Sequence, residues 1–206
     1  MSSTESFTKK RYFTPKLLVQ IAMLSAVAVV LMLFDFPLPF LPPFYKLDFS
    51  EVVVLIGGFA FGPLAAVIIE FLKIILNLLF NSTDTFFVGE IANFLIGCSF
   101  VVPAAIVYKK HKTKKAALKG LILGTIVMII VGGLMNAFIL LPVYSWAYKM
   151  PLEGLIEMGS KLNGNINELT TFVLFATTPL NLIKGILSSS IVLLIYKRLS
   201  TILKHD

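Results

Sequence analysis

The residues from Thr171 to Tyr196 form an apolar run that is long enough to cross a membrane and carries a lysine near its middle. Four polar side chains in this run are separated by four, three and four residues: Thr177, Asn181, Lys184 and Ser188. In a helix, this spacing places them in one stripe on one face. A charged side chain at the centre of a bilayer costs ~2.5–3.5 kcal/mol on insertion scales. We therefore expect Lys184 to face the interior of a helix bundle.

The composition of the whole chain supports a membrane location. Hydrophobic residues make up 57% and charged residues 14% of the 206 residues, whereas soluble domains carry roughly 25% charged residues. We predict an all-α integral membrane protein with six transmembrane helices, a single membrane domain over residues 1–206 and a first span that is retained rather than cleaved as a signal peptide. The predicted spans are residues 16–34, 49–61, 64–80, 90–108, 116–141 and 171–196.

The placement of the basic residues predicts the orientation. They gather before the first span, between Lys109 and Lys119, and after the last span, whereas only Lys46, Lys149 and Lys161 fall on the opposite side. By the positive-inside rule, both termini are cytoplasmic. Membrane orientation explains the net charge of +7 better than nucleic-acid binding does. No metal site is predicted, because the single cysteine, Cys98, lies in an apolar run.

The segment from Asp35 to Asp48 contains four prolines and no helical period. We therefore expect a stiff loop, which either acts as a lid over a pocket or rests at the membrane interface as a connector.

In the third span, Glu70 and Lys73 are spaced to form an intramembrane ion pair on one helix face. Glu90 begins the fourth span, where it is either a ligand-binding group or a first-turn carboxylate favoured by the helix dipole.

The residues from Val143 to Thr170 are predicted to form a mostly polar outer segment, with a short surface helix over Pro151–Met158. Tyr144, Trp146 and Tyr148 in this segment are typical of an interfacial aromatic belt, and stacking on a ligand is the alternative.

Eight polar side chains are brought to similar depth in the outer half of this topology, which predicts a pocket that opens outward. Amides and one lysine suit a mostly uncharged, planar ligand that has both donors and acceptors. These residues are Tyr45, Lys46, Asp48, Glu90, Asn93, Asn136, Asn181 and Lys184.

Sequence motifs for other activities are missing. The chain has no Gly-rich phosphate loop ending in Gly-Lys-Ser/Thr and no His-Glu-x-x-His pair, so we expect neither ATP hydrolysis nor metalloprotease activity by this chain. A binding subunit fits better than a pump. Two alternatives remain open: a membrane enzyme that uses Glu90 or Lys184 as acid or base, and a stand-alone secondary transporter.

Three stretches resemble the substrate-binding S components of energy-coupling-factor (ECF) vitamin transporters, most closely the riboflavin-specific ones. The first is the small-residue pattern of Leu18, Ala22 and Ala26. The second is Lys46-Leu-Asp-Phe-Ser-Glu51, followed by Gly62-Pro63. The third comprises Gly89-Glu-Ile-Ala-Asn-Phe94, Asn136 and Pro179-Leu-Asn-Leu-Ile-Lys184. Together with the six spans and the chain length, these stretches extend the resemblance over almost the whole sequence.

This resemblance implies capture of riboflavin from outside the cell, as a transported ligand and not as a cofactor. It implies that Asn136, Asn181 and Lys184 hydrogen-bond the pyrimidine edge of the flavin ring. The remaining pocket residues would be the loop residues Tyr45, Lys46, Leu47 and Asp48, together with Glu90, Asn93 and Thr177.

The resemblance also implies partners. Leu18, Ala22 and Ala26 would dock on a transmembrane coupling subunit that is driven by two ATPases, all within the lipid bilayer. An S component for another vitamin, such as thiamin or pantothenate, is the alternative.

Overall fold

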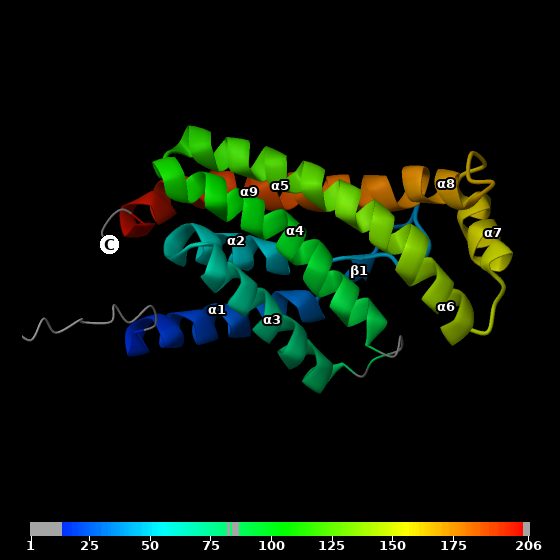
Figure 1. Cartoon of the computed structure of the whole chain (residues 1–206), viewed down its shortest axis with the longest axis horizontal. Helices are drawn as coiled ribbons and strands as arrows, with labels where there is room; N and C mark the ends of the chain where they lie inside the picture. Colours follow the sequence, from blue (N-terminus) through cyan, green and yellow to red (C-terminus); the bar gives the residue numbers. More distant parts are fainter. Residues whose placement is uncertain (1–13, 82, 84–86, 204–206) are drawn as a thin grey trace, which may run out of the picture.

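The computed structural model describes residues 14–81, 83 and 87–203, and within them the chain forms a bundle of helices (Figure 1). Lys9, Lys10, Arg11 and Lys204, which contribute to the charge argument, lie outside the described residues. The elements in chain order are α1 (Pro15–Leu33), β1 (Phe36–Pro37), β2 (Lys46–Leu47), α2 (Ser50–Phe61), α3 (Pro63–Phe80), α4 (Val88–His111), α5 (Lys114–Met135), the π-helical turn η1 (Asn136–Leu140), α6 (Leu141–Ala147), α7 (Leu152–Leu162), α8 (Leu169–Phe172), the π-helical turn η2 (Val173–Thr177) and α9 (Thr178–Leu203).

Five helical segments of the described chain are long and apolar enough to cross a membrane: Pro15–Leu33, Pro63–Phe80, Val88–His111, Lys114–Ala147 and Leu169–Tyr196. The sixth apolar helix, α2, has only 12 residues. At roughly 1.5 Å per residue it is about 18 Å long, well short of the ~30 Å hydrocarbon core of a bilayer. The chain is therefore a mostly helical membrane protein with five helical segments that are long enough to span, and with one apolar helix, α2, that is too short to cross the membrane.

The helix ends follow local sequence rules. At the start of α1, the Thr14 hydroxyl accepts a hydrogen bond from the backbone N–H of Leu17 at 3.2 Å, and Pro15 occupies the first helical position. Between α2 and α3, Gly62 adopts φ +94°, which a residue with a side chain rarely adopts. Gly62 thereby allows a sharp turn between α2 and α3, which pack against each other in the bundle.

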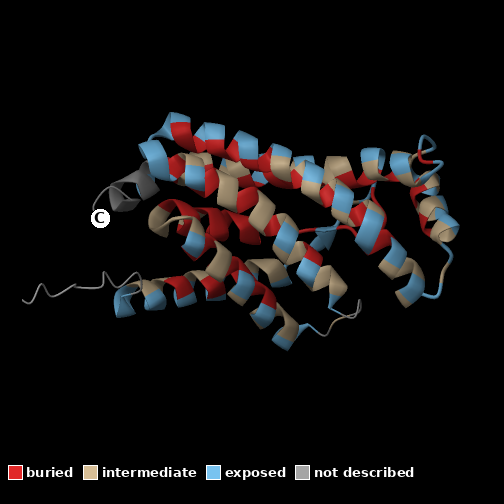
Figure 2. Ribbon diagram, viewed as in Figure 1, coloured by how far each residue is buried: buried red, intermediate tan, exposed pale blue. Residues whose placement is uncertain are grey.

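Close contact between α4 and α5 depends on two glycines. A Cβ atom at Gly120 would lie 2.7 Å from the backbone oxygen of Ala104, and one at Gly124 would meet the backbone oxygen of Phe100. Small residues at such positions let two helix backbones approach closely in a membrane. Figure 2 shows the buried residues gathered along the inner faces of the helices, with exposed residues outside.

The predicted loop between Asp35 and Asp48 is confirmed as non-helical, and it contains a small hairpin that the sequence did not indicate. β1 pairs antiparallel with β2, so that Phe36 lies opposite Leu47. The loop is held by a buried apolar cluster at one end of the bundle, in which Leu41 and Tyr45 pack with residues of α6, α7 and α8. A segment without helical hydrogen bonds is thereby fixed against three helices.

The fifth predicted span ends at Leu141, whereas the observed helix continues through η1 and α6 to Ala147. Proline removes a hydrogen bond and its ring clashes with the carbonyl four residues earlier, so a helix that passes Pro142 needs a different hydrogen-bond pattern there. Here the N–H of Leu141 donates to the carbonyl of Asn136, five residues back. This wider turn lies just before Pro142 and lets the helix pass it.

The last helical segment solves the same problem in the same way. The N–H of Thr178 donates to the carbonyl of Val173, and Pro179 follows directly. The continuous segment α8–η2–α9 extends from Leu169 to Leu203 and so exceeds the predicted span at both ends.

Two further expectations concern the connections. The basic run at 109–115 is not a loop, because α4 ends at His111 and α5 begins at Lys114, so most of the run is helical. The predicted surface helix after Pro151 is confirmed as α7. Figure 1 shows the start of α1, the α4–α5 turn and the end of α9 at one end of the bundle, and α6, α7 and α8 at the other.

Candidate ligand-binding pocket

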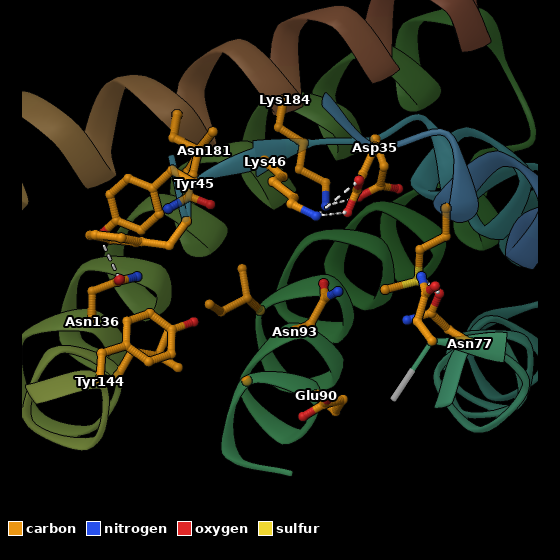
Figure 3. A pocket seen from close by; sticks show the side chains of 18 of the residues that line it. Asp35, Tyr45, Lys46, Asn77, Glu90, Asn93, Asn136, Tyr144, Asn181 and Lys184 are labelled. Atoms are coloured by element: carbon orange, nitrogen blue, oxygen red, sulfur yellow. Dashed lines mark hydrogen bonds and ion pairs between the residues drawn. The ribbon is translucent and has the colours of Figure 1, made fainter. Parts of the chain in front are cut away.

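A cavity of about 650 Å³ lies between the loop, the end of α3, the start of α4, the η1–α6 segment and α9 (Figure 3). Figure 3 shows Tyr45, Asn136 and Tyr144 on one side of the cavity and Asn77 on the other, with Asn93 and Glu90 between them. All eight polar residues that the topology placed together line it: Tyr45, Lys46, Asp48, Glu90, Asn93, Asn136, Asn181 and Lys184.

The buried hydroxyl of Tyr45 joins the loop to both polar helices. It donates to Oδ1 of Asn136 at 2.6 Å and lies 2.7 Å from Oγ1 of Thr177. The two amides are also held by their own helices, because Asn136 Nδ2 donates to the Gly132 carbonyl at 2.8 Å and Asn181 Nδ2 donates to the Thr177 carbonyl at 3.1 Å. Burial of Tyr45 raises its pKa, so its hydroxyl stays protonated and remains a donor.

The two π-helical turns lie at the level of these amides. Asn136 is the first residue of η1 and Thr177 is the last residue of η2. Such turns are frequent at functional sites, because the inserted residue changes the direction of the side chains beside it. In this chain the Asn136 amide and the Thr177 hydroxyl both lie within hydrogen-bond distance of one tyrosine hydroxyl.

Lys184 lies at the cavity wall and is held by two carboxylates. Its Nζ lies 3.0 Å from Oδ2 of Asp48 and 2.9 Å from Oε1 of Glu51. Burial alone would raise the pKa of the Asp48 carboxyl, but the charges of Lys184 and Lys73 and hydrogen bonds from Ser50 outweigh this and hold that pKa well below its ordinary value. Asp48 is therefore ionised at neutral pH, and the predicted partner for Lys184 inside the bundle is present.

The ion pair predicted between Glu70 and Lys73 is confirmed at 2.7 Å, but it is not self-contained. Lys73 Nζ also lies 3.3 Å from Oε1 of Glu51 and donates to the Ser50 hydroxyl at 3.0 Å. All of these side chains are buried. We call Asp48, Glu51, Glu70, Lys73 and Lys184 the charge network.

The outer rim of the cavity carries an ion pair and aromatic rings. Lys46 Nζ lies 3.2 Å from Oδ2 of Asp35, across the β1–β2 hairpin. Tyr144 and Tyr148 line the cavity, while Trp146 is 67% exposed. The two tyrosines therefore fit the alternative, contact with a ligand, and Trp146 fits the interfacial belt, because a helix turns residues 144 and 148 to one face and residue 146 to another.

Two of the predicted pocket residues do not line the cavity. Leu47 is 2% exposed and packs away from it, since neighbouring residues of a strand point to opposite faces and Lys46 points into the cavity. Thr177 is fully buried and is linked to the cavity through two lining residues, since its hydroxyl contacts Tyr45 and its carbonyl accepts from Asn181.

The prediction omitted several residues that matter at this site. The resemblance includes Glu51 in a motif but assigns it no role, although a carboxylate near the start of a short apolar run is itself a signal. Asn77 lies four residues after Lys73 in α3 and lines the cavity, but it is missing from the predicted pocket. Phe44, which lines the cavity and packs edge-on against Tyr45 and Tyr144, had no sequence signal beyond its place in the loop.

Comparison with known proteins places this geometry in a family. Residues 16–196 match the family described as ECF transporter, substrate-specific component. The chain is 42% identical over 190 residues to the riboflavin transporter RibU of Staphylococcus aureus (strain TCH60), which covers 92% of this chain and 93% of that protein. It is 35% identical over 185 residues to the riboflavin transporter FmnP of Bacillus subtilis (strain 168), covering 89% of this chain and 92% of that protein.

A solved structure agrees with these relatives. It is described as the S component of a bacterial ECF transporter, and it superposes with a TM-score of 0.71 at 40% sequence identity, covering 92% of this chain and 98% of that one. Match length, identity and fold agree over nearly the whole chain. The chain therefore belongs to the substrate-specific (S) components of ECF transporters.

Proposed function

We propose that this chain binds riboflavin with high affinity and is the S component of an ECF transporter in the bacterial cytoplasmic membrane. The observation that supports this most directly is the cavity wall formed by Asn136, Asn181 and Lys184. The imide N–H and the carbonyl oxygens of a flavin ring need alternating acceptors and donors, and two amides with one ammonium group supply them. The relatives named as riboflavin transporters support the choice of vitamin.

The remaining pocket residues have complementary roles in this proposal. Phe44, Tyr45 and Tyr144 offer ring faces and edges near the amides, which suits a planar aromatic ligand. Lys46 and Asp48 belong to the loop that lies over the ligand, and Glu90 and Asn93 at the start of α4 provide polar groups on the side away from Tyr45. Leu47 and Thr177 support the loop and Tyr45 from behind.

The orientation that we propose has six membrane-inserted helices, α2 among them, in a single membrane domain with both termini cytoplasmic and the cavity open to the outside. The basic residues at the α4–α5 turn support this, since they lie at the same end of the bundle as the start of α1 and the end of α9. The exposed strip of Leu18, Ala22 and Ala26 would dock on the transmembrane coupling subunit, and two ATPases would supply the energy. This role is that of a transporter subunit and not of an enzyme.

Titration of the detergent-purified protein with riboflavin tests the proposal. We expect saturable quenching of flavin fluorescence at one ligand per chain, with binding weakened by about ten-fold or more in Asn181→Ala, because a buried hydrogen-bond partner is worth ~1–3 kcal/mol. Thiamin and pantothenate serve as controls. Quenching that fails with riboflavin, together with binding of one of these vitamins, would assign the chain to another substrate.

A further inference from the structure

Three members of the charge network, Glu51, Glu70 and Lys73, do not line the cavity and are fully buried. Stability alone is a weak reason for such a group, because buried ion pairs are often no more stable than apolar residues of similar size. Among the described residues, Lys184 is the lysine that both lines the cavity and contacts Glu51, so it connects these three side chains to the cavity.

The geometry around Lys184 restricts the direction of its ammonium hydrogens. An ammonium group has three N–H donors and no acceptor. The carboxylates of Asp48 and Glu51, at 3.0 and 2.9 Å, take two of them. Asp48 lies at the cavity wall and Glu51 lies behind it. With two donors fixed in this way, the third is left for a group inside the cavity.

Glu51 is itself held in place from α3 and from its own helix. Its Oε1 is shared by both lysines, since Lys73 Nζ lies 3.3 Å and Lys184 Nζ 2.9 Å away. Its Oε2 lies 3.1 Å from the Ser50 hydroxyl, whose single hydrogen is shared with Asp48. Lys73 is held in turn by Glu70 at 2.7 Å. Glu51 is therefore held mainly through Oε1, which orients its carboxylate towards Lys184.

We propose that Glu51 is a positioning residue for ligand binding, which acts by directing the third N–H of Lys184 into the cavity, with Lys73 keeping Glu51 in place. The role rests on the proposed riboflavin function. A lysine ammonium sits on a flexible four-carbon stem, so without Glu51 it adopts other orientations and meets the ligand less often in the right one. Lys73, for which the sequence predicts only an ion pair with Glu70, thereby supports the pocket without lining it.

A double-mutant cycle on the full chain tests this role. Glu51→Gln keeps the size and one acceptor oxygen but removes the charge, and Lys184→Met keeps the stem but removes the donor. We expect Glu51→Gln to raise the dissociation constant for riboflavin on the order of ten-fold in the parent protein. In the Lys184→Met background, we expect the same change to have an effect of less than about two-fold, because the group through which Glu51 acts is absent. Equal effects in both backgrounds would overturn the proposal.

The absorption band of bound flavin gives a second, independent readout at saturating ligand. A charge held near the ring tunes its electronic spectrum, so we expect the band to move in Glu51→Gln, whereas partial unfolding would lower the amount of bound flavin without moving the band. An unmoved band would overturn the proposal even if Lys184→Met bound too weakly for the cycle.

Glu157→Gln is the matched control, since it removes a carboxylate paired with Lys161 on the surface of α7. A parent protein without any riboflavin signal would overturn the proposed function itself, and this role with it.

Discussion

At the scale of single residues, the hydroxyl of Tyr45 contacts two helical segments at once. It ties the loop to Asn136 on one helical segment and to Thr177 on another, and both contacts are buried. A hydroxyl can donate one hydrogen bond and accept others, so a single group satisfies two helices. The position of the Asn136 amide in the cavity therefore depends on a residue that is 91 positions away in the sequence.

Tyr45→Phe tests this dependence. The substitution keeps the ring and removes only the hydroxyl, which leaves the Asn136 oxygen and the Thr177 hydroxyl without this partner. We expect riboflavin binding to weaken by about five-fold to a hundred-fold, corresponding to ~1–3 kcal/mol, in a titration of the purified protein. Tyr196→Phe is the control, since it removes a buried tyrosine hydroxyl that lies 3.3 Å from that of Tyr108, outside the cavity. A similar loss in both variants would contradict a local role of Tyr45.

The sequence predicted the residues on regular helices better than those whose position depends on tertiary contacts. The stripe of Thr177, Asn181 and Lys184 follows from helical spacing, and all three side chains are buried as expected. The hydrogen bonds of Tyr45 and the link from Glu51 to Lys184 join distant segments, and no local pattern indicates which residues meet.

At the scale of elements, Pro142 marks the place where the predicted fifth span stops short of the observed helix. Pro142 and Pro179 each follow a π-helical turn, which passes the proline without ending the helix. The predicted last span already runs through Pro179, whereas the predicted fifth span ends before Pro142, as a proline often ends a helix. The contact of α4 with α5 joins distant segments, although Gly120 and Gly124 are visible in the sequence as two small residues four positions apart.

The close packing of α5 on α9 gives a prediction for Gly132. A Cβ atom at this position would lie 2.5 Å from Nδ2 of Asn181, so Gly132→Ala must displace the amide or the helix. We expect riboflavin affinity to fall roughly ten-fold, as for the loss of one buried hydrogen-bond partner. Gly164→Ala is the matched control, because a Cβ atom there would meet nothing within 4 Å. Unchanged affinity in Gly132→Ala would show that Asn181 is not fixed by this contact.

At the scale of the whole molecule, one face of α1 is not covered by the other residues that the structure describes. Leu18 is 51% exposed, and Ala22 and Ala26 are exposed on the same face. Small residues on such a face leave room for a second helix backbone to approach. None of these three residues lines the cavity, so the proposed docking strip is separate from the proposed binding site.

Ala26→Leu separates these two functions. The added bulk lies on the exposed face of α1, so we expect riboflavin binding by the isolated chain to stay within about two-fold of the parent value and co-purification with the coupling subunit to fall several-fold. Ser190→Leu adds comparable bulk to an exposed position of α9 and should leave co-purification unchanged. If both variants co-purify like the parent protein, the docking surface lies outside α1.

The shortness of α2 has a consequence for how far a bound molecule has already travelled. Its 12 residues begin with Ser50 and Glu51, beside Lys184 at about the midpoint of the segment from Leu169 to Leu203. In the proposed orientation, a vitamin held at Lys184 rests at mid-depth in the bilayer, roughly 15 Å below the outer surface of a ~30 Å hydrocarbon core. In this orientation, binding alone carries the vitamin across the outer half of the hydrocarbon core, before any nucleotide is hydrolysed. The coupling subunit and its ATPases then have to open a path only through the inner half, which is about as long as one short helix.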